Sequence, residues 1–256
     1  SYTNKIPFTL SLSKGVKGQL MIKIGKLYGI GVGPGDPELL TLKAVRVLRD
    51  ADIIAVPKSK EESDSIALSI VKGSVDLSSK ETLELMFPMT KDKEVLRKSR
   101  EEAAAAICER LKAGKDVACI TLGDPMFYST FSYLIPLLRA RVPGVEIEIV
   151  PGISSVMASA ALTVTPLTEA DERIAVIPAT YESDKIRHIL ETFDTVVLMK
   201  VNRVFDKVLR LLEELELKEK AVFIERCGGE NQRVVRDLDS LKGEKLDYLS
   251  MVIVKK

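Results

Sequence analysis

Short apolar runs alternate with amphipathic segments along most of the chain. In the first half, runs typical of buried strands occur at residues 26–32, 52–56, 117–122 and 145–150. Segments with helical spacing of apolar residues lie between them, at residues 37–49, 92–113 and 126–140. This alternation predicts βαβ units and therefore a largely parallel sheet.

The second half shows the same alternation of apolar runs and helical patterns, except near its end. A small apolar helix is expected at residues 153–162, an amphipathic helix at 182–193, and strands at 174–177, 195–199, 221–225, 234–238 and 249–255. No helical pattern separates the last two strands, so we expect them to form an antiparallel hairpin.

The fold class predicted from this pattern is α/β, with two domains, mixed and mainly parallel sheets, and a ligand cleft between the domains. The expected boundaries are 23–150 for the N-terminal domain and 151–256 for the C-terminal domain. Residues 1–22 are expected to form an N-terminal extension without ordered structure, because Met21 stands directly before the first strand.

Two of the predicted strands end in turns of the same composition. Gly33-Pro34-Gly35-Asp36-Pro37 follows the first strand, and Gly123-Asp124-Pro125 follows residues 117–122. Glycine permits a tight turn, aspartate suits a helix N-cap, and proline suits the first helical position. Ligands of open α/β sheets bind beyond the carboxyl ends of strands, so the paired turns predict a small-molecule site.

The residues after the second turn indicate the kind of molecule. Tyr128-Ser129-Thr130-Phe131 offers two hydroxyls and aromatic faces, which suit a cation that carries adenosine. Helix capping alone is an equally simple interpretation of either turn taken singly.

Composition excludes several classes of function. The 256 residues are 46% hydrophobic and 29% charged, enough for a sizeable core. Thirty-eight basic residues against 37 acidic ones give a net charge of +1, so nucleic acid is not an expected partner. No apolar run reaches the ~20 residues that cross a bilayer, so no membrane partner is expected.

Cysteine and histidine usage narrows the chemistry further. The three cysteines lack metal-ligand spacing and are odd in number, which favours reduced, buried thiols in the cytoplasm. His188 is the only histidine, so neither a metal site nor a Ser/His/Asp triad is predicted. Both a dinucleotide fingerprint and a P-loop are absent from the sequence.

Three ordered motifs carry a resemblance over residues 26–256. GxGPGDPELLTLKA at Gly31–Ala44, GDPMFYSTF at Gly123–Phe131 and PGISS at Pro151–Ser155 resemble the tetrapyrrole methylase superfamily, the class III S-adenosylmethionine-dependent methyltransferases. VPKS at residues 56–59, FPMT at 87–90 and YSTF at 128–131 are similar to the branch that methylates carbon 20 of precorrin-2 or cobalt-precorrin-2 in cobalamin biosynthesis.

This resemblance implies a homodimer of two-domain chains, each of which holds S-adenosylmethionine between its two domains and releases S-adenosylhomocysteine. By matching position, the expected cofactor-binding residues are Pro34, Gly123, Asp124, Pro125, Met126, Phe127, Ser129, Thr130, Ser154, Ser155, Met199 and Cys227. Gly33 and Gly35, with Asp36 nearby, are expected to help form the floor of the trough that takes the tetrapyrrole substrate.

Methyl transfer from a sulfonium requires alignment of two reactants and exclusion of water rather than a protein nucleophile. A methylated meso carbon must also lose a proton, and Asp36, Asp124 and Tyr128 are equal candidates for accepting it. Lys58, Lys91, Arg97 and Arg226, with the Ser59 hydroxyl, are candidates for binding the substrate's carboxylates, although ordinary surface charge explains each equally well.

Two alternative functions stay open at this stage. One is another branch of the same fold, acting on uroporphyrinogen III or another precorrin carbon. The other is a non-catalytic domain that binds a nucleotide in its glycine-rich turns.

Overall fold

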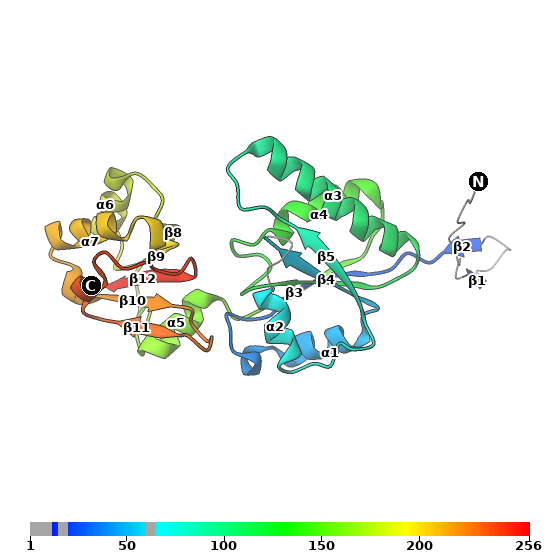
Figure 1. Cartoon of the computed structure of the whole chain (residues 1–256), viewed down its shortest axis with the longest axis horizontal. Coiled ribbons are helices and arrows are strands. Elements are labelled where there is room, and N and C mark those ends of the chain that lie inside the picture. The colour runs from blue at the N-terminus through cyan, green and yellow to red at the C-terminus, as the bar shows by residue number, and fades with distance from the viewer. Residues whose placement is uncertain (1–11, 15–19, 60–64) are drawn as a thin grey trace. The chain divides into compact units, whose positions relative to one another are not determined.

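The computed structural model describes residues 12–14, 20–59 and 65–256, and its internal contacts divide the chain into two compact units (Figure 1). Unit 1 ends at Ile153, and unit 2 runs from Ser154 to Lys256. Most of the expected extension, residues 1–22, lies outside the described residues. Within it, β1 (Leu12–Lys14) pairs antiparallel with β2 (Leu20–Ile22).

Unit 1 is built on a five-stranded sheet in the order β5-β4-β6-β3-β7, and every neighbouring pair is parallel. Its strands are β3 (Leu27–Gly31), β4 (Ile53–Lys58), β5 (Glu81–Met86), β6 (Val117–Thr121) and β7 (Ile147–Val150). The predicted parallel sheet is therefore confirmed. All five carboxyl ends lie at one edge, because parallel strands run in the same direction.

Helices cover both faces of this sheet (Figure 1). One face packs against α1 (Leu42–Asp50) and α2 (Ile66–Lys72), and the other against α3 (Lys93–Lys112) and α4 (Phe131–Arg141). Helix α2 and strand β5 were not predicted. The central strands β4 and β6 are almost fully buried, as expected of a sheet covered on both sides.

Two predicted helices start later than expected. Pro37–Leu39 forms a single 3₁₀ turn, Leu40 is extended, and α1 begins after Thr41, whose hydroxyl accepts a hydrogen bond from the Ala44 amide. Helix α4 begins only at Phe131, because Tyr128 has a left-handed backbone with φ of 52°. The prediction that Asp124 and Pro125 open this helix is therefore wrong.

Unit 2 contains a second five-stranded sheet in the order β11-β10-β12-β9-β8. Its strands are β8 (Ile174–Pro178), β9 (Thr195–Met199), β10 (Ala221–Glu225), β11 (Arg233–Val235) and β12 (Ser250–Lys255). Only β8 and β9 are parallel, and the other three pairings are antiparallel.

The expected hairpin of the last two strands is wrong. Strands β11 and β12 both pair with β10, on its opposite edges, and β12 continues to β9. A 3₁₀ turn, Leu238–Leu241, lies between them in sequence and places Leu238 and Leu241 in the core. Because Leu238 and Leu241 are buried, the segment between β11 and β12 packs into the core and does not form a tight turn between two neighbouring strands.

Three helices complete unit 2: α5 (Ser155–Thr163), α6 (Ser183–Thr192) and α7 (Phe205–Glu214). Val156 of α5 packs on one face of the sheet, while α6 and α7 bury apolar side chains on the other face. Among the described residues, no helix combines the length and the apolar character needed to cross a membrane.

Candidate functional site

Four glycines bring three strand ends of unit 1 together. Gly33 follows β3 and Gly123 follows β6, and their backbones exchange two hydrogen bonds, Gly123 N to Gly33 O at 2.8 Å and Gly33 N to Gly123 O at 3.3 Å. Both residues have positive φ, 79° and 70°, which glycine adopts without strain.

Gly31 and Gly152 complete this glycine cluster (Gly31, Gly33, Gly123, Gly152). A Cβ at Gly31 would lie 2.5 Å from the Gly152 nitrogen, and a Cβ at Gly152 would lie 2.2 Å from the Gly123 oxygen. Neither position can carry a side chain without moving backbone. The ends of β3, β6 and β7 are therefore in direct main-chain contact.

Asp124 joins two of these segments through its side chain. Its Oδ1 accepts a hydrogen bond from the Met126 amide at 2.8 Å, and its Oδ2 accepts one from the Gly152 amide at 3.0 Å. Both carboxylate oxygens are therefore bonded to main-chain donors.

Asp36 has a different environment. Its Oδ1 accepts a hydrogen bond from the Glu38 amide at 2.8 Å and so caps the 3₁₀ turn, as its sequence context predicted. Pro34 beside it is buried, whereas Gly35 and Asp36 are partly exposed. Asp36 thus lies at the accessible edge of the glycine-rich loop.

The turn after Asp124 exposes large apolar side chains. Met126, Phe127 and Tyr128 are 56%, 38% and 52% exposed, and the two rings meet edge to face with centroids 4.9 Å apart. Ser129, in contrast, is buried, and its hydroxyl is bonded to Thr121 Oγ1 at 3.0 Å and to the Phe131 amide at 3.1 Å.

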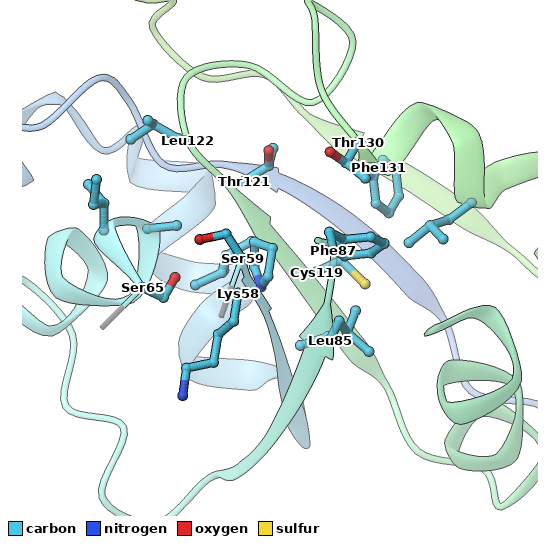
Figure 2. Close-up of a pocket in the computed structure, with 16 residues that line it drawn as sticks. Lys58, Ser59, Ser65, Leu85, Phe87, Cys119, Thr121, Leu122, Thr130 and Phe131 are labelled. Carbon is cyan, nitrogen blue, oxygen red and sulfur yellow. The ribbon is translucent and has the colours of Figure 1, made fainter. Parts of the chain in front are cut away.

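A cavity of about 290 Å³ opens at the carboxyl ends of β4, β5 and β6 (Figure 2). Polar groups from several elements line it: Lys58, Ser59, Ser65, Thr121 and Thr130. Its apolar lining includes Leu85, Phe87, Phe131 and Leu134. Lys58 Nζ forms an ion pair with Glu84 Oε1 at 2.9 Å, and in Figure 2 its side chain extends away from Thr130 and Phe131.

Several lining residues were not singled out from the sequence. Leu85 lies on the edge strand β5, which was missed because three of its six residues are exposed. Phe87 follows this strand and belongs to the FPMT segment noted in the sequence. The alternation of Leu83, Leu85 and Phe87 was the available signal, since a period of two indicates a half-buried strand.

Three of the candidate cations do not line this cavity. Lys91 is exposed before α3, and Arg97 of α3 binds Glu94 at 2.9 Å and Glu101 at 2.8 Å on its own helix. The hydrogen bonds to these carboxylates raise the pKa of Arg97, and the bond to Glu94 has the larger effect. Arg226 lies in unit 2, where it pairs with Asp247 at 2.9 Å.

Unit 2 carries the other predicted cofactor residues. The Ser154 hydroxyl accepts a hydrogen bond from the Met157 amide at 3.3 Å and caps α5, and Ser155 is its first residue. Met199 is the last residue of β9, Cys227 follows β10 by two residues, and both pack with Val156 in one apolar cluster. These residues therefore lie at the start of α5 and at the carboxyl ends of β9 and β10, two strands separated by β12.

All three cysteines are buried and free, as expected. Burial raises the pKa of Cys119, which lines the cavity, to about 12, and burial also raises the pKa values of Cys108 and Cys227. These thiols are neutral at physiological pH and are not nucleophiles in this state.

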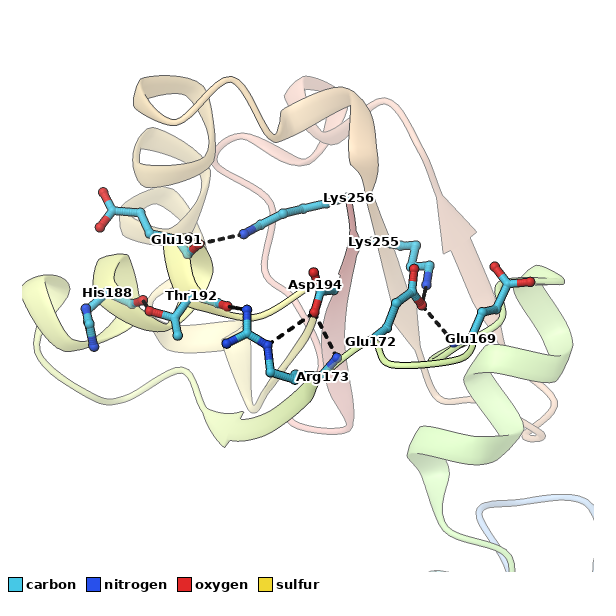
Figure 3. Close-up of polar contacts among 9 residues, drawn as sticks. All are labelled: Glu169, Glu172, Arg173, His188, Glu191, Thr192, Asp194, Lys255 and Lys256. Atoms are coloured by element: carbon cyan, nitrogen blue, oxygen red, sulfur yellow. Dashed lines mark hydrogen bonds and ion pairs between the residues drawn. The ribbon is translucent and has the colours of Figure 1, made fainter.

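His188 lies on the exposed side of α6 (Figure 3). Its carbonyl accepts the Thr192 hydroxyl at 2.6 Å, and the neighbouring polar contacts, such as Arg173 N to Asp194 Oδ2 at 2.8 Å, connect backbone segments of the unit. In the described part of the chain, no three His, Cys, Asp or Glu side chains are grouped for binding a metal ion.

The fold is that of a two-unit α/β protein whose strand-end turns carry hydroxyls, aromatic rings and carboxylates. Residues 26–241 match the family model for tetrapyrrole (corrin/porphyrin) methylases. The chain therefore belongs to this family and is a methyltransferase.

Known proteins with similar sequences agree with this membership. The chain is 36% identical to the cobalt-precorrin-2 C(20)-methyltransferase of Salmonella typhimurium over 233 residues, which cover 91% of this chain and 97% of that protein. It is 52% identical over 154 residues to the "Probable cobalt-precorrin-2 C(20)-methyltransferase" of Methanocaldococcus jannaschii, covering 60% of this chain and 64% of that protein, less than two thirds of its length.

A solved structure shares the fold. The X-ray structure of a cobalamin biosynthetic enzyme, cobalt precorrin-4 methyltransferase, aligns with a TM-score of 0.68 at 25% identity, covering 90% of this chain and 94% of that one.

Proposed function

We propose that this chain transfers the methyl group of S-adenosylmethionine to carbon 20 of precorrin-2 or cobalt-precorrin-2, a step of cobalamin biosynthesis. The observation that carries the proposal is the 36% identity to the Salmonella typhimurium enzyme of that name over almost the full length of both chains. The VPKS, FPMT and YSTF segments agree with it.

The residues at the strand ends fit this methyl donor. Exposed aromatic rings at Phe127 and Tyr128 suit a sulfonium cation, and hydroxyls and main-chain groups suit a ribose and an amino acid. We propose that the donor binds at Pro34, Gly123, Asp124, Pro125, Met126, Phe127, Ser129, Thr130, Ser154, Ser155, Met199 and Cys227. When bound, it supplies an activated methyl group.

The cavity shown in Figure 2 is a candidate binding site for the second reactant, the tetrapyrrole. Ligand pockets commonly enclose about 300–1,000 Å³, so a cavity of about 290 Å³ would take one edge of a tetrapyrrole rather than the whole ring. We propose that Lys58 and Ser59 bind a peripheral carboxylate there and that Gly33, Gly35 and Asp36 lie under the ring.

The remaining cations have weaker support. Lys91, Arg97 and Arg226 stay candidates for carboxylates on other edges of the substrate, although Arg97 and Arg226 already pair with carboxylates of the chain. Asp36, Asp124 and Tyr128 stay candidates for accepting the proton that leaves the methylated carbon.

The decisive experiment incubates the purified chain with labelled S-adenosylmethionine and precorrin-2, with and without cobalt. A product heavier by one methyl group, located at carbon 20 by NMR, is expected. Methylation at another carbon, or of uroporphyrinogen III instead, would assign the chain to another branch. Thermal stabilisation by ATP or NAD but not by S-adenosylhomocysteine would favour a non-catalytic nucleotide-binding domain.

Lys58 provides a separate test of substrate binding. A charge-assisted hydrogen bond contributes about 1.5–3 kcal/mol, so Lys58→Gln should raise the KM for the tetrapyrrole roughly tenfold or more. Affinity for S-adenosylhomocysteine should stay unchanged. Lys112→Gln, an exposed position at the end of α3, is the control. Equal KM values for the two variants would contradict the proposed role of Lys58 in binding the substrate.

We further propose that the enzyme acts as a homodimer in the cytoplasm. The family resemblance supports the dimer, and three free, buried cysteines suit a reducing compartment. Light scattering of the purified chain should give twice the 28.2 kDa mass of one chain.

A further inference from the structure

Both oxygens of the Asp124 carboxylate accept hydrogen bonds from main-chain amides. The carboxylate lies between two main-chain donors, the Met126 amide on its own turn and the Gly152 amide, 28 residues further along the chain. Distances of 2.8 and 3.0 Å are those of well-formed hydrogen bonds to an ionised acceptor.

These two donors belong to different strand ends. Met126 lies in the turn after β6, and Gly152 lies in the turn after β7, directly before the Ser154 cap of α5. The glycine cluster already brings these strand ends into contact, and a Cβ at Gly152 would lie 2.2 Å from the Gly123 oxygen. The Asp124 carboxylate adds a side-chain hydrogen bond between the two turns.

Accepting a proton would conflict with this arrangement. A protonated carboxyl carries a hydrogen on one of its two oxygens. That oxygen would still face a main-chain N–H group but would be a weaker acceptor for its hydrogen bond. Protonation would therefore weaken one of the two bonds. Asp36 accepts one such bond, from the Glu38 amide to its Oδ1, and lies in a partly exposed loop.

We propose that Asp124 is a positioning residue: its carboxylate fastens the turn of residues 123–128 to Gly152 and so holds both segments in the geometry that binds the methyl donor, without taking the substrate's proton. This inference rests on the proposed function for the identity of the ligand. The fastening itself concerns only contacts within unit 1.

The test compares Asp124→Asn and Asp124→Ser with the wild-type chain. Asparagine keeps the shape but has one carbonyl oxygen, so it can accept from only one of the two amides, and serine can cap the local turn but is too short to reach Gly152. Asp92→Asn is the matched control, because Asp92 also accepts two main-chain amides, from Glu94 and Val95, but at the start of α3.

The first measurement is amide hydrogen exchange of Met126 and of residues 150–157 in the unliganded chain. Asp124→Ser should exchange the Gly152 amide at least about tenfold faster than wild type, because a hydrogen bond to a charged group is lost. Asp124→Asn should speed exchange at whichever of the Gly152 and Met126 amides its single carbonyl oxygen leaves without a partner. Asp92→Asn should leave this exchange unchanged. Wild-type exchange rates at Gly152 in both Asp124 variants would overturn the inference.

The second measurement is S-adenosylhomocysteine affinity by calorimetry, followed by steady-state kinetics. Asp124→Asn should weaken binding roughly tenfold or more, whereas kcat at saturating donor should fall by a much smaller factor and should keep the acidic limb of its pH profile. A large loss of kcat with unchanged affinity and loss of the acidic limb of the pH profile would instead make Asp124 the proton acceptor. If wild type binds no S-adenosylhomocysteine, the proposed function fails, and exchange at Gly152 alone decides the positioning role.

Discussion

At the scale of single residues, the site depends on positions where no side chain fits. Gly31 and Gly152 approach the backbone of neighbouring segments so closely that even a methyl group would overlap main-chain atoms. The sequence indicated glycine-rich turns at these strand ends. The reason for glycine at Gly31 is contact with a segment about 120 residues away, which no local pattern reveals.

Substitution of Gly31 by alanine tests this contact. The new Cβ would meet the Gly152 nitrogen at 2.5 Å and the Gly123 oxygen at 2.6 Å, both main-chain atoms that cannot rotate away. Overpacking costs about 1–3 kcal/mol or more, so thermal denaturation should show a clearly lower Tm together with weakened donor binding.

Gly144→Ala is the control for this variant. Gly144 has a φ of 81° and open space around its Cβ position, so its replacement adds backbone strain without a clash. A Gly31→Ala chain as stable as the Gly144→Ala chain would show that the glycine cluster is not closely packed in solution.

At the scale of elements, an ion-pair network fixes the amino-terminal end of the unit 1 sheet. Glu148 of β7 contacts Lys26 at 2.7 Å, just before β3, and Lys43 of α1 at 2.5 Å. Hydrogen bonds from Lys26 and then Lys43 lower the pKa of Glu148 from 4.5 to about 2. Two strands and a helix are thereby joined at the edge opposite to the site.

Glu148→Gln should reveal this network through the pH dependence of stability. A carboxyl whose pKa is lower in the folded state stabilises the fold above its unfolded value and loses that contribution as the pH falls through the folded value. The variant should be less stable than wild type at pH 7, by about 1 kcal/mol or less for so accessible a group. The difference should vanish between about pH 4.5 and pH 2.

Urea denaturation at several pH values measures this difference. Glu146→Gln, at a side chain that is 70% exposed, serves as the control and should have a smaller effect. A stability difference for Glu148→Gln that is constant from pH 7 to pH 2 would argue against the ion pairs as its source.

Element boundaries also show where local sequence falls short. The amphipathic pattern correctly predicted α1, α3 and α6, and the small apolar segment predicted α5, whereas α2 and α7 were not predicted. The apolar runs predicted strands from β3 to β12 except β5. The start of α4 was missed because Asp124 and Pro125 have the composition of a helix start, and Asp124 does accept the local Met126 amide, but the left-handed backbone of Tyr128 interrupts the chain before Phe131. The local hydrogen bond of Asp124 is formed, but no helix follows it directly.

At the scale of the whole molecule, each unit has its own core. In unit 2, Phe223 of β10 is fully buried and meets Phe205 of α7 with ring centroids 5.7 Å apart. In unit 1, Ile107 of α3 is fully buried against the parallel sheet. Units with separate cores can unfold separately.

Two core variants should show this independence. Phe223→Ala should destabilise unit 2 by about 3–5 kcal/mol and Ile107→Ala should destabilise unit 1 by about 2–5 kcal/mol. Hydrogen exchange followed by mass spectrometry should then show faster exchange only in peptides after Ser154 for the first variant, and only in peptides before Ile153 for the second. Acceleration throughout the chain in either variant would mean that the two units unfold as one.

The sequence by itself determined the α/β class and most helices and strands. It also determined the glycine-rich turns at Gly33–Asp36 and Gly123–Asp124 and the family motifs. Each of these features depends on residues that are close together in the chain. Only the tertiary structure decided that β12 lies between β10 and β9, that Gly31 and Gly152 touch, and that Asp124 bonds to Gly152. These features require contacts between distant segments, and neither hydrophobic period nor residue propensity specifies which distant partner a strand end or a carboxylate will meet.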